Sequence, residues 1–306
     1  MKKFLSMLCA CAMAFSTITC ASATSLQEPE HSNEPILISS SVTNEYDILV
    51  ADQESAEGAA SCNDGPSVEE ILLERAQLPT DVLTTKYGYS NEDIAILKSY
   101  DGSPIEDNPQ LRGIFADLHG YLYRMDYNDH GVTVRFSWNW EGMPVTTQTD
   151  VVTCAWVGVN SKNGPHALRF VDEESSFNVD YYTFPIAITG ATEFATRTPY
   201  DINDSDVNSH VSAEFPMVYH GGNIWAQKGY MDVTLEEPVA TNDLEYSTVV
   251  FAYGHEKLIL AANLDVSIDG ISISITPTGT TEKMWDGSIS IWGNGYYESN
   301  GDAKPE

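Results

Sequence analysis

Gly131-Val132-Thr133-Val134-Arg135-Phe136-Ser137-Trp138-Asn139-Trp140 is the stretch that decides the fold. Its hydrophobic residues alternate strictly with polar ones, so one face of the extended chain is aliphatic and aromatic and the other is polar. Such alternation is typical of antiparallel strands with one buried and one solvated face. Residues 120–126 precede it, and a turn at 127–130 joins the two segments. The sequence therefore predicts a β-hairpin whose aromatic face packs in a core.

Further strand-like runs follow this hairpin. They are separated by turns rich in Gly, Asn and Asp, without the helical crossovers that parallel strands need. This organisation predicts a mainly β domain over residues 105–298, built as an antiparallel β-sandwich or jelly roll. The predicted strands cover residues 151–159, 168–170, 177–184, 211–219, 229–235, 248–253, 257–264, 271–276 and 288–292.

Two or three short α-helices are expected before the β domain, over residues 67–104. Ser67 is followed three residues later by Glu70, which is the capping-box pattern of a helix start. Ser90 and Asp93 announce a second helix, and the residues between the two helices have room for one more turn. Helices this short are not stable alone, so we expect them to pack on the β domain.

Residues 24–66 contain nine carboxylates and no Lys or Arg. Because like charges repel and few apolar side chains are present, this composition predicts an acidic, disordered leader. Two short apolar clusters, at 35–38 and 46–50, leave an alternative in which the segment adds an edge strand to the sheet. At the other end of the chain, residues 299–306 are expected to form a polar tail.

The first 23 residues have the layout of a secretory signal peptide. Two lysines precede an uncharged apolar stretch, and the small residues Ala21 and Ala23 suit cleavage before Thr24. We therefore expect a secreted, extracellular protein. A lipid anchor at Cys11 is the alternative, although the apolar run before this cysteine is short. No second apolar stretch is long enough to span a membrane.

The chain has 45 acidic and 15 basic residues, a formal net charge of −30 at pH 7. A nucleic-acid binder needs a basic surface to neutralise phosphates, and an anionic membrane repels an acidic one, so neither partner is expected. The charge favours cationic ligands, Ca²⁺ included. The competing interpretation is that it simply keeps a secreted protein soluble.

Three of the five cysteines lie in the signal peptide, which leaves Cys62 and Cys154. One interpretation is a disulfide between them, formed in the oxidising exterior. The other is that Cys154, inside an apolar strand, is a small buried residue while Cys62 lies in the leader. The sequence leaves both open.

Catalytic motifs are absent from the sequence after the signal peptide: there is no Gly-x-Ser-x-Gly, no His-Glu-x-x-His, no phosphate-binding Gly loop and no Cys/His zinc pattern. A metalloprotease or a nucleotide-dependent enzyme is therefore disfavoured. Glycoside hydrolysis needs only two carboxylates across a cleft, but so acidic a chain supplies such pairs by chance. The candidates in or beside predicted strands are Glu141, Glu193, Glu214, Asp232 and Asp265.

The best calcium candidate is the segment 201–208. Asp201, Asn203 and Ser205, with Asp206 next to them, resemble the start of an EF-hand loop. The pattern then fails, because Asp206 stands where the loop needs Gly and Ser212 where it needs Glu. A solvated Asx-rich turn is the competing interpretation, and no other cofactor is predicted.

Exposed aromatic residues are the last candidates, because sugar rings stack on Trp and Tyr faces. Trp292 falls on the opposite side of its strand from the neighbouring isoleucines, and Tyr296 and Tyr297 follow it. Trp225, in the predicted loop 219–225, is the second candidate. Edge packing is the competing interpretation for both. By contrast, the tryptophans with the parity of core positions are Trp138, Trp140 and Trp156.

These observations lead to a secreted, non-catalytic β-sandwich protein that recognises an extracellular glycan or protein through exposed aromatic residues. The alternative is an extracellular, glycosidase-like hydrolase that uses paired carboxylates on a jelly-roll scaffold. A third hypothesis is a structural protein without a ligand.

Overall fold

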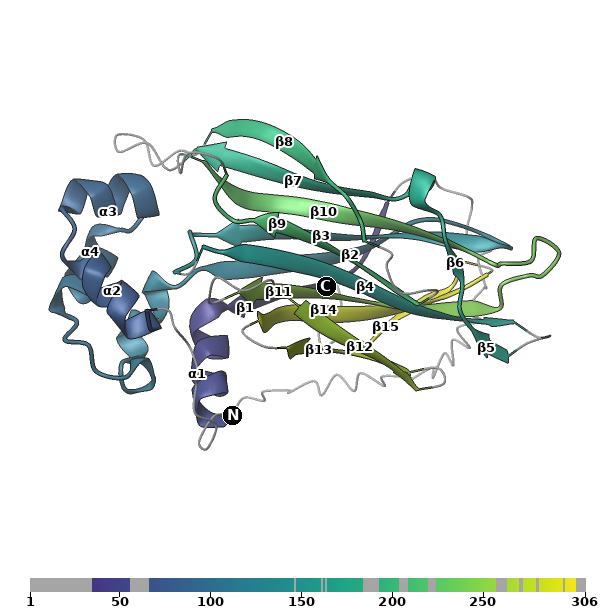
Figure 1. The fold of residues 1–306 in the computed structure, drawn as a ribbon, viewed down its shortest axis with the longest axis horizontal. Helices are drawn as coiled ribbons and strands as arrows, with labels where there is room; N and C mark the ends of the chain where they lie inside the picture. Colours follow the sequence, from purple (N-terminus) through teal and green to yellow (C-terminus); the bar gives the residue numbers. More distant parts are fainter. Residues whose placement is uncertain are drawn as a thin grey trace, which may run out of the picture.

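A computed structural model describes residues 35–55, 66–145, 147–160, 162, 164–183, 193–203, 209–219, 224–256, 263–269, 272–278, 281–293 and 295–300. Two antiparallel β-sheets enclose the main hydrophobic core, and short helices gather at one end (Figure 1). The mainly β, antiparallel sandwich that the sequence predicts is confirmed.

The larger sheet has seven strands in the order β1-β2-β3-β10-β7-β8, with β6 paired to β10. The predicted hairpin, β2 with β3, lies within it, and its strands pair from Asp117 and Glu141 to the turn. The strands are β1 (Ile36–Asn44), β2 (Asp117–Asn128), β3 (Gly131–Glu141), β6 (Arg169–Phe170), β7 (Ser176–Thr183), β8 (Phe194–Tyr200) and β10 (Ile224–Glu236).

The other sheet has six strands in the order β15-β14-β11-β4-β5, with β9 paired to β4. A separate hairpin, β12 with β13, packs Ile275 on Ala155, Val250 and Ala252 of this sheet. The strands are β4 (Thr149–Asn160), β5 (Gly164–His166), β9 (His210–Pro216), β11 (Tyr246–Glu256), β12 (Asn263–Asp269), β13 (Ser272–Thr278), β14 (Thr281–Trp292) and β15 (Tyr297–Asn300).

The alternation in β3 builds the core between the sheets. Trp138 and Trp140 are at most 1% exposed, whereas the polar residues between the buried ones stay partly exposed. The Trp138 ring lies 5.6 Å from that of Phe177 and 5.4 Å from that of Phe215. Burial of each large apolar side chain contributes about 1.5–3 kcal/mol. Trp156 is buried as well, so the predicted core positions of these tryptophans are confirmed.

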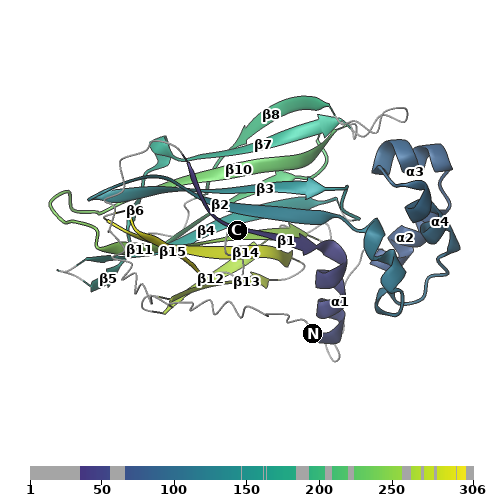
Figure 2. The same cartoon turned by 180° about the vertical axis from the view of Figure 1, so that it is seen from behind.

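A helical cap lies at one end of the sandwich (Figures 1 and 2). Both predicted helix starts are confirmed: the capping box predicted at Ser67 is present, since Ser67 accepts from the Glu70 N–H, and Ser90 also forms one by accepting from the Asp93 N–H. The cap has its own hydrophobic cluster, separate from the core of the sandwich. Its elements are α2 (Val68–Ala76), α3 (Thr80–Tyr87) and α4 (Asn91–Ser99), followed by the 3-10 turns η1 (Ile105–Asp107) and η2 (Pro109–Ile114).

Arg75 of α2 attaches the cap to the sandwich. Its guanidinium is buried and donates to the carbonyl oxygens of Val145, at 2.5 Å, and Pro144, at 3.3 Å. It also donates to the Tyr89 hydroxyl at 2.6 Å and lies 4.3 Å from the centroid of the Tyr87 ring. A buried guanidinium satisfied in this way fixes the position of the helix that carries it.

Residues 36–55 are ordered, so the expectation of a disordered leader over 24–66 is wrong for this part. β1 pairs with β2, which is the edge-strand alternative, and α1 (Glu45–Ser55) follows (Figure 2). Asp47 forms a 2.9 Å ion pair with Arg112, whose hydrogen bonds lower the pKa of the Asp47 carboxyl. Glu45 is fully buried beside His255. Arg112 and His255, both from later in the chain, thus give these two acidic residues partners that the sequence-based expectation did not include.

The remaining terminal predictions fall mostly outside the described residues, which omit positions 1–34 and 56–65. Ser299 and Asn300 pair with β14 as part of β15, so the predicted polar tail is shorter than expected, and 301–306 are not described. Within the described part of the chain, no helix combines the length and apolar character needed to cross a membrane.

Candidate functional site

Three aromatic rings meet on the outer face of the six-stranded sheet, at the end opposite the helical cap. Tyr246 begins β11 and pairs with Trp292 at the end of β14, with ring centroids 5.6 Å apart and planes at 29°. The Tyr296 ring, after β14, stands at 62° to the Trp292 indole, 5.1 Å away. Tyr296 is 54% exposed, and the other two are partly exposed. We refer to Tyr246, Trp292 and Tyr296 as the aromatic platform.

Two apolar side chains extend the platform across the sheet. The register places Tyr246 opposite Val159 of β4, and Val159 opposite Pro165 of β5. Neighbouring strands lie about 4.8 Å apart, so Trp292, Tyr246, Val159 and Pro165 form a row over four strands. The result is a narrow apolar strip with the Tyr296 ring standing at one end.

A rigid turn holds Tyr296 against Trp292. The Trp292 N–H donates to the Tyr296 carbonyl at 2.8 Å, and the Gly295 N–H donates to the Trp292 carbonyl at 2.8 Å. Gly295 has a φ of 82°, and a Cβ at this position would lie 2.3 Å from the Tyr127 ring. Arg124 also donates to the Gly295 carbonyl. The turn therefore requires glycine here and leaves the platform little freedom.

Tyr297 is close to the platform but does not belong to it. It pairs with Ile291, a core residue, and is 36% exposed. The Arg124 guanidinium lies 5.3 Å from the Tyr297 ring centroid and 4.6 Å from that of Tyr127. The structure thus brings Trp292 and Tyr296 together, whereas Tyr297 shares the inner face with Ile291 and contacts the buried Arg124.

Carboxylates border the platform. The Tyr296 hydroxyl donates to Oε1 of Glu298 at 3.1 Å. This hydrogen bond raises the pKa of the Tyr296 phenol, because ionisation removes the donor and adds a second negative charge. Glu245, directly before Tyr246, is exposed. The Glu298 carboxylate therefore lies directly at the edge of the platform.

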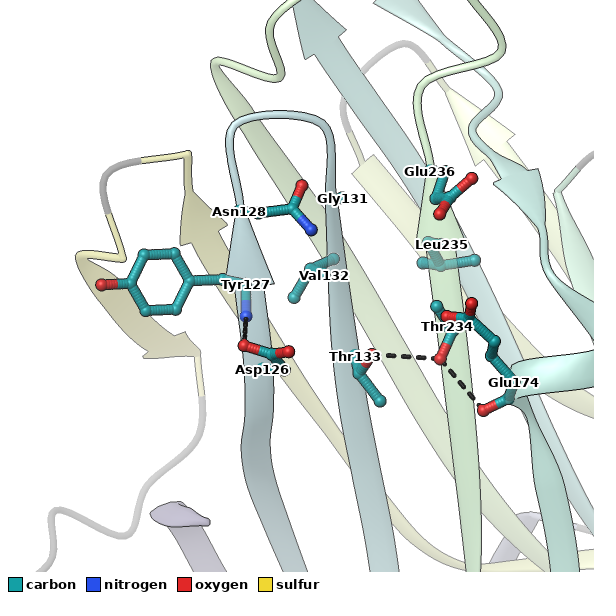
Figure 3. Close-up of a pocket in the computed structure, with 10 residues that line it drawn as sticks. All are labelled: Asp126, Tyr127, Asn128, Gly131, Val132, Thr133, Glu174, Thr234, Leu235 and Glu236. Atoms are coloured by element: carbon teal, nitrogen blue, oxygen red, sulfur yellow. Dashed lines mark hydrogen bonds between the residues drawn. The ribbon is translucent and has the colours of Figure 1, made fainter. Parts of the chain in front are cut away.

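A shallow depression of about 50 Å³ lies at the same end, between the β2–β3 turn and β10 (Figure 3). The Thr133 and Thr234 hydroxyls, 3.0 Å apart, line it, and Tyr127 points its ring away from it (Figure 3). This volume holds one or two water molecules, too few for a small-molecule pocket. Its acidic lining residues are Asp126, Glu174 and Glu236.

Trp225 is 2% exposed and belongs to the core, so its predicted place in an exposed loop is wrong. It lies in β10, opposite Tyr182 of β7. A register shift between Ala226 and Lys228 lets both Trp225 and Ala226 be buried, which breaks the expected alternation. The Trp225 ring is therefore not available to a ligand.

The calcium candidate is only partly described. Asn203 forms a β-bridge with Ser212, with backbone hydrogen bonds of 2.7 and 3.1 Å, and Asp201 precedes it. Ser205 and Asp206 lie outside the described residues. Among the residues that are described, no group of three or more His, Cys, Asp or Glu side chains is arranged to hold a metal.

Cys154 is a free, fully buried thiol in β4, and burial raises its pKa. This matches the interpretation as a small core residue. Cys62, the other member of the predicted pair, lies outside the described residues.

The carboxylates considered for hydrolysis have other partners or lie apart. Both oxygens of Asp232 accept from Arg135, at 2.6 and 2.7 Å. Glu141 lies 3.2 Å from the imidazole of His119 on the neighbouring strand. Glu214 and Glu193 are exposed on β9 and before β8, and the side chain of Asp265 is outside the described part.

The structure also contains a buried acidic cluster that the sequence did not reveal. Nδ1 of His255 lies 2.7 Å from Oδ1 of Asp150, and Nε2 lies 3.9 Å from Oε1 of Glu45. The two Glu45 oxygens accept from the Val145 N–H at 3.0 and 2.9 Å, and Asp150 accepts from the Tyr253 hydroxyl. The side chains of Glu45, Asp150 and His255 have no exposed surface.

This cluster joins α1, β4 and β11 and does not reach a substrate. Burial raises the pKa of the Tyr253 phenol, with the Asp150 carboxylate adding to the effect. His255 and Asp150 are 105 residues apart in sequence, and Glu45 and Val145 are 100 apart. No local motif connects them, so only the fold reveals the cluster.

Comparisons with known proteins add little. No family model matches the chain, and no curated protein does. Clostridium perfringens delta-toxin is similar over 61% of this chain and 89% of its own, at 8% identity and a TM-score of 0.24. AvmM, which catalyses macrocyclization in alchivemycin A biosynthesis, is similar over 51% and 81%, at 10% identity and a TM-score of 0.22. Likenesses at these scores carry no argument about function.

Proposed function

We propose that this is a secreted, non-catalytic β-sandwich protein that binds an extracellular glycan through the aromatic platform. The observation that supports it most is that Tyr246 of β11, Trp292 of β14 and Tyr296 of the following turn lie side by side with exposed or partly exposed rings. The apolar C–H faces of a sugar stack on such rings, and the phenol groups bond its hydroxyls. Because the rings are held in place before binding, little conformational entropy is lost.

The shape of the platform favours a glycan over a protein partner. The apolar row is one side chain wide, and the next row of the same face has the Thr248 and Ser290 hydroxyls, which are 2.9 Å apart. A stable protein interface buries about 800 Å² on each partner, with a broad apolar centre. A narrow strip bordered by hydroxyls suits a linear sugar chain better.

The hydrolase alternative has less support. A glycosidase needs two carboxylates facing each other across an accessible cleft. Asp232 is bound by Arg135, and Asp150 and Glu45 are buried around His255. None of these carboxylates faces the aromatic platform in the described structure.

A glycan array tests the proposal. The intact protein is expected to bind a subset of glycans, and Trp292→Ala is expected to weaken that binding about tenfold, since ring contacts contribute roughly 0.5–1.5 kcal/mol beyond their buried area. Phe194→Ala is the matched control, because Phe194 is 56% exposed on β8 of the other sheet. Binding that survives Trp292→Ala, or that falls equally in the control, contradicts the proposal.

Secretion rests on the pattern of residues 1–23 alone. Mass spectrometry of the culture medium is expected to find a chain that begins at Thr24. Recovery of the intact chain only inside the cells contradicts this part of the proposal.

A further inference from the structure

We infer that the glycan bound at the aromatic platform carries protonated amino groups, as a polymer of unacetylated amino sugars does. This inference rests on the proposed function and adds the charge class of the ligand. It follows from the electrostatics of the rings, the carboxylates beside them, and the charge of the surrounding surface.

The faces of aromatic rings attract cations. Close to the platform, one such cation–π contact is present inside the protein. The Arg124 guanidinium lies over Tyr127 and Tyr297, with centroid distances of 4.6 and 5.3 Å. Trp292 and Tyr296 are rings of the same kind, one partly exposed and the other 54% exposed. An ammonium group above an indole is held by the ring quadrupole, most strongly for Trp.

The Glu298 carboxylate lies where such an ammonium group needs an acceptor. Glu298 accepts the Tyr296 hydroxyl at 3.1 Å and is exposed, and Glu245 is exposed directly before Tyr246. A protonated amine has three donors and no acceptor, so a ring face with carboxylates at its border complements it. A neutral sugar gains the stacking but not this charge-assisted bonding.

The wider surface at this end of the molecule is also negatively charged. Of its cations, Arg169 is paired with Glu236, whereas Lys162 donates to the neutral Asn242 amide oxygen at 2.7 Å and keeps its charge, which the more numerous exposed carboxylates of this end outweigh. The net charge of −30 adds to the field, although salt screens it beyond about 8 Å. An acidic glycan is therefore repelled. The exposed carboxylates in the turns of this end are Asp126, Asp129, Asp172, Glu173, Glu174 and Asp243.

Isothermal titration with two oligosaccharides of equal length tests the inference. One is a chitosan oligosaccharide and the other is its N-acetylated counterpart, which has the same backbone without the charge. At a pH that keeps the amines protonated, the wild-type protein is expected to bind the charged form at least about fivefold more tightly, with the ratio falling as salt is added.

Three variants test which side chains produce the preference for the charged oligosaccharide. Trp292→Ala is expected to weaken binding of both oligosaccharides, whereas Glu298→Gln lowers only the preference for the charged form. Glu193→Gln is the matched control, since Glu193 is an exposed carboxylate directly before β8 of the other sheet. It is expected to leave the preference unchanged.

The outcomes separate the inference from the proposed function. Equal or tighter binding of the acetylated form, still sensitive to Trp292→Ala, overturns the inference and leaves glycan binding intact. Binding of neither form overturns both. A lysine homopolymer of matched charge that binds as tightly as chitosan, in wild type and Trp292→Ala alike, shows ionic attraction only and also overturns the inference.

Discussion

The two ends of the sandwich handle negative charge in opposite ways. At the end with the helical cap, Glu45 and Asp150 are withdrawn from water and face His255. At the other end, Glu298 remains exposed beside the Tyr296 ring, and Glu245 is exposed directly before Tyr246 in the sequence. In the first case the carboxylates hold segments of the chain together. In the second case the exposed carboxylates are accessible to ligands and ions in solvent.

The difference follows from what covers each end. α1 and the Val145 N–H close over the first cluster, so its charges must be satisfied inside the protein or the fold loses stability. No such helix covers Glu298 in the described part of the second end, and water stabilises exposed carboxylates at little cost. A cluster of ionisable residues is therefore not by itself evidence of a functional site. A ligand can reach such residues only where they are exposed to solvent.

Asp150→Asn probes the buried end and is expected to have the largest effect. The change removes the carboxylate that lies 2.7 Å from Nδ1 of His255 and replaces a charged acceptor of the Tyr253 hydroxyl with a neutral amide, at a site without exposed surface. The free energy of unfolding is expected to fall by about 3–5 kcal/mol, measured by urea denaturation. The exposed-site variant Glu193→Gln is the control and should change it little. A loss for Asp150→Asn as small as that of the control would show that the buried charges do not hold the segments together.

Gly295→Ala probes the exposed end, with an intermediate effect. The added Cβ lies 2.3 Å from the Tyr127 ring at a φ of 82°, so the turn must shift. Unfolding free energy is expected to fall by about 2–3 kcal/mol, and binding at the platform should weaken with it. Gly164→Ala is the matched control, with a φ of 65° and no atom within 4 Å of the added Cβ, and is expected to cost only about 1 kcal/mol. Equal losses in the two variants would mean that the contact with Tyr127 does not matter.

Glu298→Gln has the smallest expected effect and reports on the charge at the platform. The Glu298 carboxylate raises the pKa of the Tyr296 phenol, so its neutralisation is expected to lower that pKa towards the ordinary value. The stabilisation from this bond is present below the ordinary phenol pKa and is lost as pH rises through the raised one. NMR titration of the Tyr296 ring measures the shift. An unchanged pKa of the Tyr296 phenol would show that the Glu298 carboxylate does not act on this ring.

The sequence anticipated those features that depend on local pattern. Alternation in β3 places Trp138 and Trp140 in the core, and the position of Trp292 opposite its isoleucine neighbours gives its outward direction. The capping boxes at Ser67 and Ser90 are equally local. Each of these features spans only a few residues, so propensity and periodicity suffice.

Other features were missed because distant residues determine them. β1 is ordered by pairing with β2, and the acidic α1 after it is stabilised by Arg112 and His255. The register shift in β10 inverts the expected exposure of Trp225. Tyr246 joins the platform only because β11 lies beside β14.

By itself, the sequence determined a mainly β chain with short capped helices and an outward-facing Trp292, because side-chain period and caps act over a few residues. The tertiary structure decided which carboxylates are buried with His255 and which border the platform, and which rings Trp292 contacts. Strand order and register bring together residues that are far apart along the chain, and no local pattern encodes that proximity.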